Sequence, residues 1–310
     1  MDRILITGAS GFVGQNVNPY LSVVFDVKGI SRQSSSEGLT YAAFFEKEIA
    51  YDAIIHLAGK AHDLKKTSND NDYFEANFEL TKKLFDAFLK SDAQKFIYIS
   101  SVKAVADTVV GVLTEEVKPN PITAYGKSKL AAENYILSHE LPATKKVFIL
   151  RPSMIHGPGN KGNLNLLYQL VSKGLPWPLG AFENQRSFLS IENLCFVIKE
   201  LLTQQTVPSG VYNVADDKPL STNELIQLIA AAQSKKARII HISKGFIRGV
   251  AKIGGILHLP LNEERLQKLT ENYVVSNNKI IKAIGKPLPV QSKEGLLKTF
   301  KSFQKINKNA

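Results

Sequence analysis

The chain has 310 residues, of which 44% are hydrophobic, so it is long enough to bury a large core. Its single cysteine excludes an intramolecular disulfide framework, and no apolar run reaches the ~20 residues that span a bilayer. A predicted strand begins by Ile4, so we expect that no signal peptide precedes the fold and that the protein is cytoplasmic. The formal charge of +11 admits polyanionic partners, among them charged small molecules.

The first predicted element is a short buried strand, Arg3 to Thr7, and a glycine-rich run, TGASGFVG, ends it and leads into a helical stretch towards Leu21. Glycines here let the backbone turn tightly and approach a pyrophosphate, which then lies against the free N–H groups of the helix. The GxxGxxG spacing differs from the common GxGxxG, so a turn that only packs the helix on the strand is the alternative. The residues predicted to bind a dinucleotide here are Gly8, Ser10, Gly11, Phe12, Val13 and Gly14.

Two more short apolar runs follow, Ala53 to Leu57 and Phe96 to Ser100, and helix-like stretches separate them from their neighbours. This alternation predicts an α/β fold with a parallel, doubly wound sheet. Ligands of such sheets bind beyond the carboxyl ends of the strands. The residues at these ends are His56, Ala58, Gly59, Ser100 and Ser101.

Tyr125 is followed four residues later by Lys129 in the run AYGKSKLAAENY, and on a helix this spacing places both side chains on one face. A phenol titrates near pH ~10, and an ammonium about 4 Å away in a partly desolvated site can lower its pKa to about 7. The pair can therefore make the tyrosine an acid and a base near neutral pH. The same spacing is common on exposed helices, so the pair alone does not establish chemistry.

In order and spacing these motifs resemble those of the extended short-chain dehydrogenases/reductases, specifically the NAD-dependent epimerase/dehydratase family that acts on nucleotide sugars. The resemblance covers nearly the whole chain. Its motifs are TGxxGxxG from Thr7, HLAG from His56, Asn77, Ser100 with Ser101, Tyr125 with Lys129, and RPSMIHGPG from Arg151. It implies a Rossmann-type domain at residues 1–156 and 187–215, and a smaller substrate-binding lobe at residues 157–186 and 216–310.

The resemblance also implies a catalytic triad. Ser101 would hold the substrate oxygen, and Tyr125 would exchange a proton with it. Lys129 would bind the nicotinamide ribose and lower the pKa of Tyr125. Ser100 points the other way along its strand and is assigned a structural role. The further cofactor-binding residues would be Leu57, Ala58 and Gly59.

The end of the second strand bears on the identity of the cofactor. NAD-preferring relatives place an acidic residue against the ribose hydroxyls, whereas this chain has Ser31 there, followed by Arg32. Loss of the carboxylate removes repulsion against a 2′-phosphate, and a guanidinium can add a charge-assisted hydrogen bond. We therefore favour NADP over NAD. The alternative is that Arg32 is a solvated loop charge.

The residues after the triad serine limit the reaction. Relatives that dehydrate a sugar carry Asp and Glu there, but this chain has Val102 and Lys103. Valine cannot transfer a proton, so the usual 4,6-dehydratase chemistry is not expected. We interpret Lys103 as a loop charge near the mouth of the site.

Two catalytic reactions and one non-catalytic role remain open. The favoured reaction is NADPH-dependent reduction of a 4-keto UDP-sugar, N-acetylated or 6-deoxy, for surface polysaccharide. The alternative reaction is a UDP-sugar 4-epimerase with tightly bound NAD. A dinucleotide-binding sensor without chemistry is the third candidate, and the presence of the complete triad disfavours it.

The second half of the chain is expected to bind the rest of the substrate. Arg186, in QRSFLSIENL, matches the family's arginine for the sugar nucleotide's diphosphate, and a planar fork of donors suits phosphate oxygens. Asn163 and Arg265 are further candidates, although Arg265 is equally explained as an exposed helical charge. A polyanionic substrate and cofactor would account for part of the net positive charge of the protein, so we expect no nucleic-acid partner. We expect no structural metal, and the resemblance implies a homodimer.

The run at residues 245–261 is apolar and carries Arg248 and Lys252, so it could lie on an anionic bilayer surface. Gly254 and Gly255 are expected to interrupt a helix there. Packing within the lobe is therefore the favoured interpretation of this run.

Overall fold

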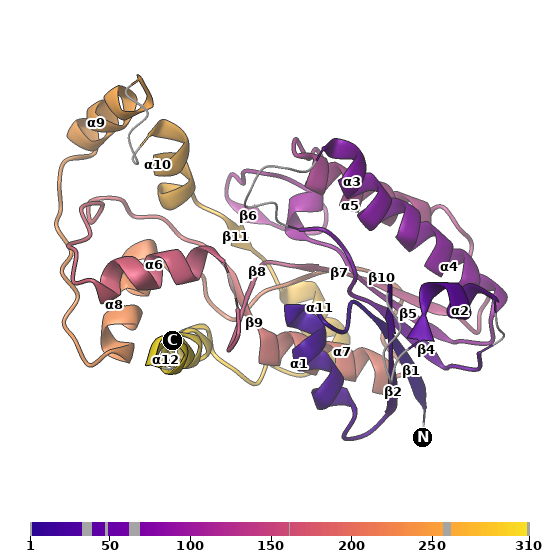
Figure 1. Ribbon diagram of the computed structural model, residues 1–310. Coiled ribbons are helices and arrows are strands. Elements are labelled where there is room, and N and C mark those ends of the chain that lie inside the picture. Colours follow the sequence, from indigo (N-terminus) through magenta and orange to yellow (C-terminus); the bar gives the residue numbers. More distant parts are fainter. Residues whose placement is uncertain are drawn as a thin grey trace.

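The computed structural model describes residues 2–32, 39–46, 49–61, 69–160, 162–256 and 262–308. Within these residues the centre of the molecule is a seven-stranded parallel sheet (Figure 1) in the order β10-β7-β5-β4-β1-β2-β3. Its strands are β1 (Arg3–Thr7), β2 (Asp26–Ser31), β3 (Leu39–Thr40), β4 (Ala53–His56), β5 (Lys95–Ile99), β7 (Lys146–Pro152) and β10 (Gly210–Val214). This sheet confirms the predicted doubly wound α/β fold.

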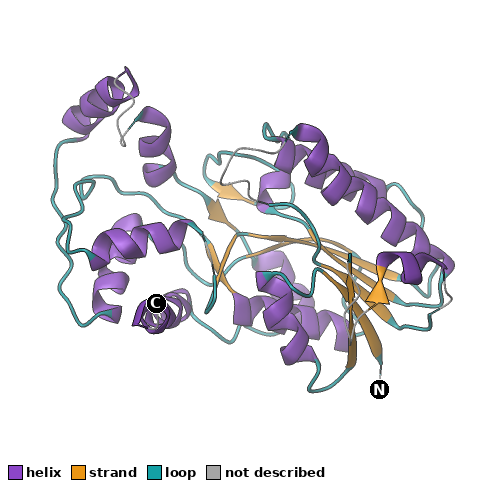
Figure 2. Ribbon diagram, in the orientation of Figure 1, coloured by secondary structure: helices purple, strands orange, loops and turns teal. Residues whose placement is uncertain are grey.

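The middle strands are buried because helices cover both faces of the sheet (Figure 2). All residues of β4 and β5 are buried, which explains why their sequences are continuous apolar runs rather than alternating ones. The helical segments are α1 (Phe12–Leu21), α2 (Tyr41–Glu46), α3 (Asp70–Phe74), the π-helix η1 (Glu75–Glu79), α4 (Leu80–Lys90), the 3-10 turn η2 (Val102–Ala104), α5 (Ala124–Leu137), α6 (Asn163–Ser172), α7 (Ile191–Thr203), α8 (Thr222–Ala232), α9 (Lys244–Ile256), α10 (Glu263–Thr270), α11 (Asn278–Ile284) and α12 (Ser292–Lys308).

Each face of the sheet has its own apolar core. On one face, side chains of α1, α7 and α11 pack on Ile4, Ile6 and Ile55. On the other face, side chains of α2, α4 and α5 pack on Leu5 and Ile54. Because successive residues of a strand point to opposite faces, β1 supplies both cores.

A third apolar core lies in a lobe built largely from helices α6, α8, α9, α10 and α12. Two short parallel pairs extend from the sheet domain towards this lobe, as Figure 1 shows. They are β8 (Met154–His156) with β9 (Phe188–Ser190), and β6 (Val112–Leu113) with β11 (Val274–Val275). Helix α11 differs from the division predicted from the sequence, because Ile280 and Ile284 pack in the core of the sheet rather than in the lobe.

Within the described ranges, no helix has the length and apolar character that a membrane span needs.

Candidate active site

The turn after β1 requires glycine for reasons of backbone geometry. Gly8 has a φ of +71°, and a Cβ on it would lie 2.7 Å from the backbone nitrogen of Ala58. A Cβ on Gly14 would lie 2.3 Å from the carbonyl oxygen of Gly8. No described side chain caps α1, which begins directly after Gly11, so its first N–H groups are not satisfied by a side-chain cap. The glycine run therefore packs α1 closely on β1 and begins the helix without a side-chain cap.

Beside this turn is a cleft of about 1010 Å³. Residues from the ends of β1, β2 and β4 line it, together with residues of α3, η1 and α4. Eight residues predicted to bind the cofactor are among them, namely Gly8, Ser10, Gly11, Ser31, Arg32, Leu57, Ala58 and Gly59. Phe12 and Val13 pack against the apolar core behind the turn. A bare backbone turn, a helix N-terminus and a guanidinium in one large cleft fit a dinucleotide with its phosphates.

A buried chain of hydrogen bonds fixes the loop after β4. The Thr81 hydroxyl donates to the Asn77 carbonyl (2.6 Å), so it accepts from His56 Nε2 (2.8 Å). His56 Nδ1 is then the acceptor for the Thr7 hydroxyl at 2.6 Å. Thr7 Oγ1 in turn accepts the backbone N–H of Ala58 at 3.2 Å. His56 therefore holds the cofactor loop in place as a neutral imidazole.

Asn77 connects the same loop to the helix that carries Tyr125. Its side chain accepts from the backbone nitrogen of Lys60 at 2.8 Å and donates to the carbonyl of Lys60 at 3.0 Å. It also donates to the Ser128 hydroxyl at 2.9 Å, and Ser128 donates to the carbonyl of Tyr125 at 2.9 Å. Asn77 thus holds backbone groups of the site and does not itself present a reactive atom.

The structure brings together Ser101 and Tyr125, two members of the predicted triad. Tyr125 lies in the first turn of α5, and its hydroxyl is near enough to Ser101 for that side chain to influence its pKa. Burial raises the pKa of Tyr125, and the neighbouring Ser101 side chain acts in the opposite direction. Tyr125 is therefore a protonated phenol at neutral pH in this structure.

Lys129, the third member, lies one helical turn further along and is buried. Its Nζ donates to the carbonyl of Ile99 at 2.9 Å and lies 4.8 Å from the centre of the Tyr98 ring. Burial lowers the pKa of Lys129 to about 8, and Glu133 opposes that shift. A Cβ on Gly59 would lie 3.2 Å from Nζ, which puts the amine beside the wall of the cleft.

The expected lowering of the Tyr125 pKa by Lys129 was wrong for this structure. The phenol hydroxyl and the ammonium share a helix face, but burial of Tyr125 dominates and raises its pKa. Lys129 instead directs its charge at the Ile99 carbonyl and the Tyr98 ring.

Ser100 points away from this site, as its place in the strand predicts. Its hydroxyl donates to the carboxylate of Glu133, which also forms a buried ion pair with Arg151. The guanidinium binds through two nitrogens, with Nη2 2.5 Å and Nε 3.1 Å from Oε2. Because Glu133 lies on α5 and Arg151 on β7, this pair fixes the helix that carries Tyr125 and Lys129 to the sheet.

The two positions that carry helper acids in dehydratases are filled differently here. Val102 is buried and has no proton to transfer. Lys103 is not the loop charge that we expected, because its Nζ donates to the carbonyl of Asp107 at 2.7 Å and lies 4.4 Å from the centre of the Tyr273 ring. Burial lowers the pKa of Lys103, whereas the negative charge of Glu271 acts to raise it. The contact with Tyr273 comes from a distant part of the chain, so no local sequence signal could have indicated it.

The substrate residues predicted in the second half of the chain come from three separate segments. Arg186 Nη1 donates to the carbonyl of Lys268 at 3.0 Å, and Nη2 lies 3.8 Å from Glu271 Oε1. Burial lowers the pKa of Arg186 below its usual value. Arg265 is exposed on α10. Asn163 is the first residue of α6, and its side chain lies outside the part that the structure describes.

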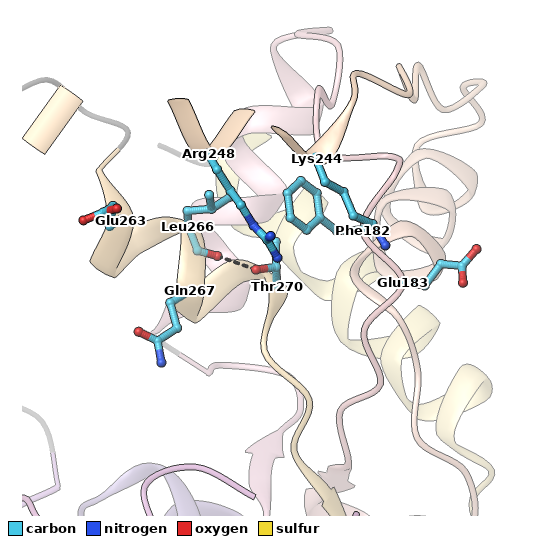
Figure 3. Close-up of a pocket in the computed structure, with 8 residues that line it drawn as sticks. All are labelled: Phe182, Glu183, Lys244, Arg248, Glu263, Leu266, Gln267 and Thr270. Carbon is cyan, nitrogen blue, oxygen red and sulfur yellow. Dashed lines mark hydrogen bonds between the residues drawn. The ribbon is translucent and has the colours of Figure 1, made fainter. Parts of the chain in front are cut away.

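A second cavity of about 420 Å³, which the sequence did not indicate, lies in the lobe beside α9 and α10 (Figure 3). Lys244 and Arg248 of α9 extend into it from one side. Its lining residues are Phe182, Glu183, Lys244, Arg248, Glu263, Leu266, Gln267 and Thr270. Among the described residues, no three His, Cys, Asp or Glu side chains are grouped so as to hold a metal ion.

Comparison with known proteins decides the family. Residues 4–215 match the model of the NAD dependent epimerase/dehydratase family. The chain belongs to this family. It is 29% identical over 321 residues to a UDP-glucose 4-epimerase of Vibrio cholerae, and the match covers 98% of this chain and 96% of that protein. It is 26% identical to a GDP-6-deoxy-D-mannose reductase of Pseudomonas aeruginosa, over 77% of this chain and 82% of that protein.

A solved structure supports the same fold. The UDP-N-acetylglucosamine 4-epimerase of Bacillus cereus superposes with a TM-score of 0.77 at 18% identity, covering 98% of this chain and all (100%) of that one. Members of the epimerase/dehydratase family named here are NAD(P)-dependent enzymes, so the chain is an enzyme of this type. The predicted membership and the Rossmann-type fold are thereby confirmed.

Proposed function

We propose that this enzyme reduces a 4-keto sugar carried on a nucleoside diphosphate, with NADPH as the reductant. The observation that carries the proposal is the place of Tyr125 beside Ser101, after the carboxyl end of β5, with the phenol held protonated by burial. Reduction of a ketone requires a group that gives up a proton, and a protonated phenol meets that requirement. An epimerase uses the same tyrosine first as a base and then as an acid, so the preference for reduction rests on the NADP assignment argued from Ser31 and Arg32.

Each residue of the triad has a defined part in this reaction. A bound reduced nicotinamide would supply the hydride for the carbonyl carbon. Tyr125 gives its proton to the carbonyl oxygen, so that ketone, hydride and proton together form the alcohol. Ser101 donates a hydrogen bond to the same oxygen and stabilises the developing negative charge. Lys129, beside the cleft wall, would hold the ribose and contribute positive charge near the site.

The cofactor preference rests on the end of β2. Ser31 and Arg32 line the cleft where NAD-preferring relatives carry a carboxylate. A serine leaves room for a 2′-phosphate, and the guanidinium beside it supplies the charge-assisted donor that such a phosphate requires. These two residues are the support for NADP rather than NAD.

In the lobe, we assign the diphosphate of the substrate to Arg186, with Asn163 and Arg265 as further ligands. Arg186 is partly buried next to Glu271, so a guanidinium is already ordered at the side of the lobe that faces the sheet domain. A UDP-sugar with an N-acetyl or 6-deoxy group is the proposed substrate. The division into residues 1–156 with 187–215 and 157–186 with 216–310, in which α11 packs back on the sheet domain, and a homodimer through α5 are part of the same proposal.

A second candidate function is a UDP-sugar 4-epimerase with tightly held NAD. Its support is the likeness to the Vibrio cholerae UDP-glucose 4-epimerase over nearly the whole length of both chains. In that reaction Tyr125 removes a proton from the C4 hydroxyl while hydride leaves C4, and both return after the keto sugar turns over.

The deciding experiment identifies the nucleotide that stays with the purified protein, and then follows NADPH absorbance when a UDP-4-keto sugar is added. An empty site with substrate-dependent oxidation of NADPH supports the reductase. Retained NAD⁺, conversion of a UDP-sugar to its C4 epimer and no consumption of NADPH would establish the epimerase instead. A chain that binds dinucleotide but turns over neither substrate would indicate a sensor.

A further inference from the structure

Helix α9 exposes a line of apolar side chains on the surface of the lobe. Phe246, Val250 and Ile253 are spaced four and three residues apart, so they share one side of the helix. Phe246 is 63% exposed and Ile253 is 57% exposed. Ile247 and Ala251 are buried against the lobe, so α9 has more apolar surface than the lobe covers.

The other side of α9 is basic. Lys244, Arg248 and Lys252 follow one another at intervals of four residues, all three are exposed, and α9 contains no acidic residue. The surrounding sequence continues this pattern, because residues 225–262 contain six Lys or Arg and neither Asp nor Glu. A helix that combines an apolar side with a Lys/Arg side is suited to the interface of an anionic membrane.

The acidic side chains near α9 do not cancel its positive charge. Glu183 and Glu263 share the lobe cavity with Lys244 and Arg248 (Figure 3), so two of the bases have acidic groups nearby. Lys252 does not line that cavity. The segment between α8 and α9 adds Lys235, Lys236 and Arg238, which are all exposed.

The position of α9 leaves its outer side accessible. It lies at the outer end of the lobe, away from the large sheet, and the segment 233–243 leads to it along the edge of the lobe (Figure 1). The helix is continuous through Gly254 and Gly255, contrary to the interruption expected from the sequence. Residues 257–261 of the same apolar run lie outside the described residues.

We propose that α9 docks this enzyme on an anionic lipid surface, with Phe246, Val250 and Ile253 entering the headgroup region and Lys252, which is exposed outside the lobe cavity, contacting lipid phosphates. This inference goes beyond the proposed reaction and does not rest on it. A second copy is the less suitable occupant, because α9 carries no acidic residue with which the bases of another α9 could pair. Nucleic acid matches the bases but offers no partner for the apolar line.

The test measures co-sedimentation of the full chain with vesicles of phosphatidylcholine alone or mixed with phosphatidylglycerol. We expect binding to the mixed vesicles only, weakened by added salt. Phe246→Ser with Ile253→Ser should weaken binding by about tenfold or more, and Lys252→Gln by about fivefold. Val23→Ser is the matched control, because Val23 is an exposed apolar residue (78%) beyond α1, and it should leave binding unchanged.

Unchanged binding of nucleotide cofactor shows that each variant is folded. The proposal is overturned if the parent chain does not bind the mixed vesicles at low salt, or if the α9 variants bind as the parent does. It is also overturned if Phe246→Ser abolishes a concentration-dependent dimer while vesicle binding is unaffected. Binding of RNA in place of mixed vesicles would assign the basic surface to nucleic acid and overturn it as well.

Discussion

The Nδ1 atom of His56 accepts a hydrogen bond from the hydroxyl of Thr7 at 2.6 Å, in the interior of the sheet domain. The other ring nitrogen donates to Thr81, so both nitrogens have assigned roles in the neutral imidazole. A proton added to Nδ1 would face the hydroxyl proton of Thr7 and remove its acceptor. Burial and the nearby charge of Lys129 accordingly lower the pKa of His56 to about 3.

This relationship makes the fold sensitive to acid. The unfolded chain takes up a proton on His56 below about pH 6.5, but the folded chain does so only near pH 3, so stability falls as the pH falls between these values. At about pH 5, His56 alone should lower the free energy of unfolding by about 2 kcal/mol relative to neutral pH. Urea unfolding at the two pH values measures the change.

The matched variants for this experiment are His56→Gln and His139→Gln. The first should be less stable than the parent at neutral pH but should lose about 2 kcal/mol less on acidification. The second should keep the acid sensitivity of the parent. An equal loss in the parent and in His56→Gln would show that His56 is not the responsible group.

The hydroxyl of Tyr125 is predicted to be essential for turnover and dispensable for cofactor binding. Tyr125→Phe keeps the ring and removes the proton donor, so kcat should fall by about 10²- to 10⁴-fold while the Kd for the cofactor stays within a factor of about 2. Tyr73→Phe is a matched control, because its ring lies 6.4 Å from that of Tyr125. It should remain active. Turnover by Tyr125→Phe close to the parent value would contradict the assigned role.

The pKa of Lys129 predicts an alkaline limit to activity. Burial lowers this pKa to about 8, so the free enzyme loses the ammonium as the pH rises through that value. We expect kcat/KM to decline above about pH 8. In the Lys129→Arg variant the guanidinium stays charged at every accessible pH. We expect this variant to be less active than the parent, but its kcat/KM should not decline above about pH 8. Lys127→Arg, on the exposed side of α5, should keep the parent profile, and a Lys129→Arg profile that also declines near pH 8 would assign the limit to another group.

The residues that line the cleft beside β1 could largely be predicted from the sequence because their signals are local. A strand, a glycine turn and a helix follow one another directly at Gly8, and Ser31 and Arg32 lie at the end of the next strand. The packing of Lys103 on Tyr273 could not be predicted, because it depends on how the lobe returns to the sheet domain. The raised pKa of Tyr125 is another such case, since burial is a property of the whole fold.

The basis for cofactor choice can be tested on β2. Arg32→Ala should raise the Kd for NADP by about tenfold and the Kd for NAD by less than about twofold. Only NADP carries the 2′-phosphate that the guanidinium would bind. Ser31→Asp should reverse the preference by repelling that phosphate. Lys28→Ala is the control, since Lys28 is exposed on the same strand and does not line the cleft. Equal effects of Arg32→Ala on both cofactors, measured by fluorescence titration, would refute the NADP assignment.

The ion pair of Glu133 and Arg151 should be necessary for stability, and the cost of breaking it should depend on which charge remains. Both side chains are nearly inaccessible to solvent, at 1% and 5% exposure. Glu133→Gln leaves a buried guanidinium without its counter-charge and should lower the free energy of unfolding by about 3–5 kcal/mol. The double variant Glu133→Gln with Arg151→Met removes both charges and should be clearly more stable than the single variant. If urea unfolding gave the single variant the stability of the parent, the pair would not be what fixes α5 to the sheet.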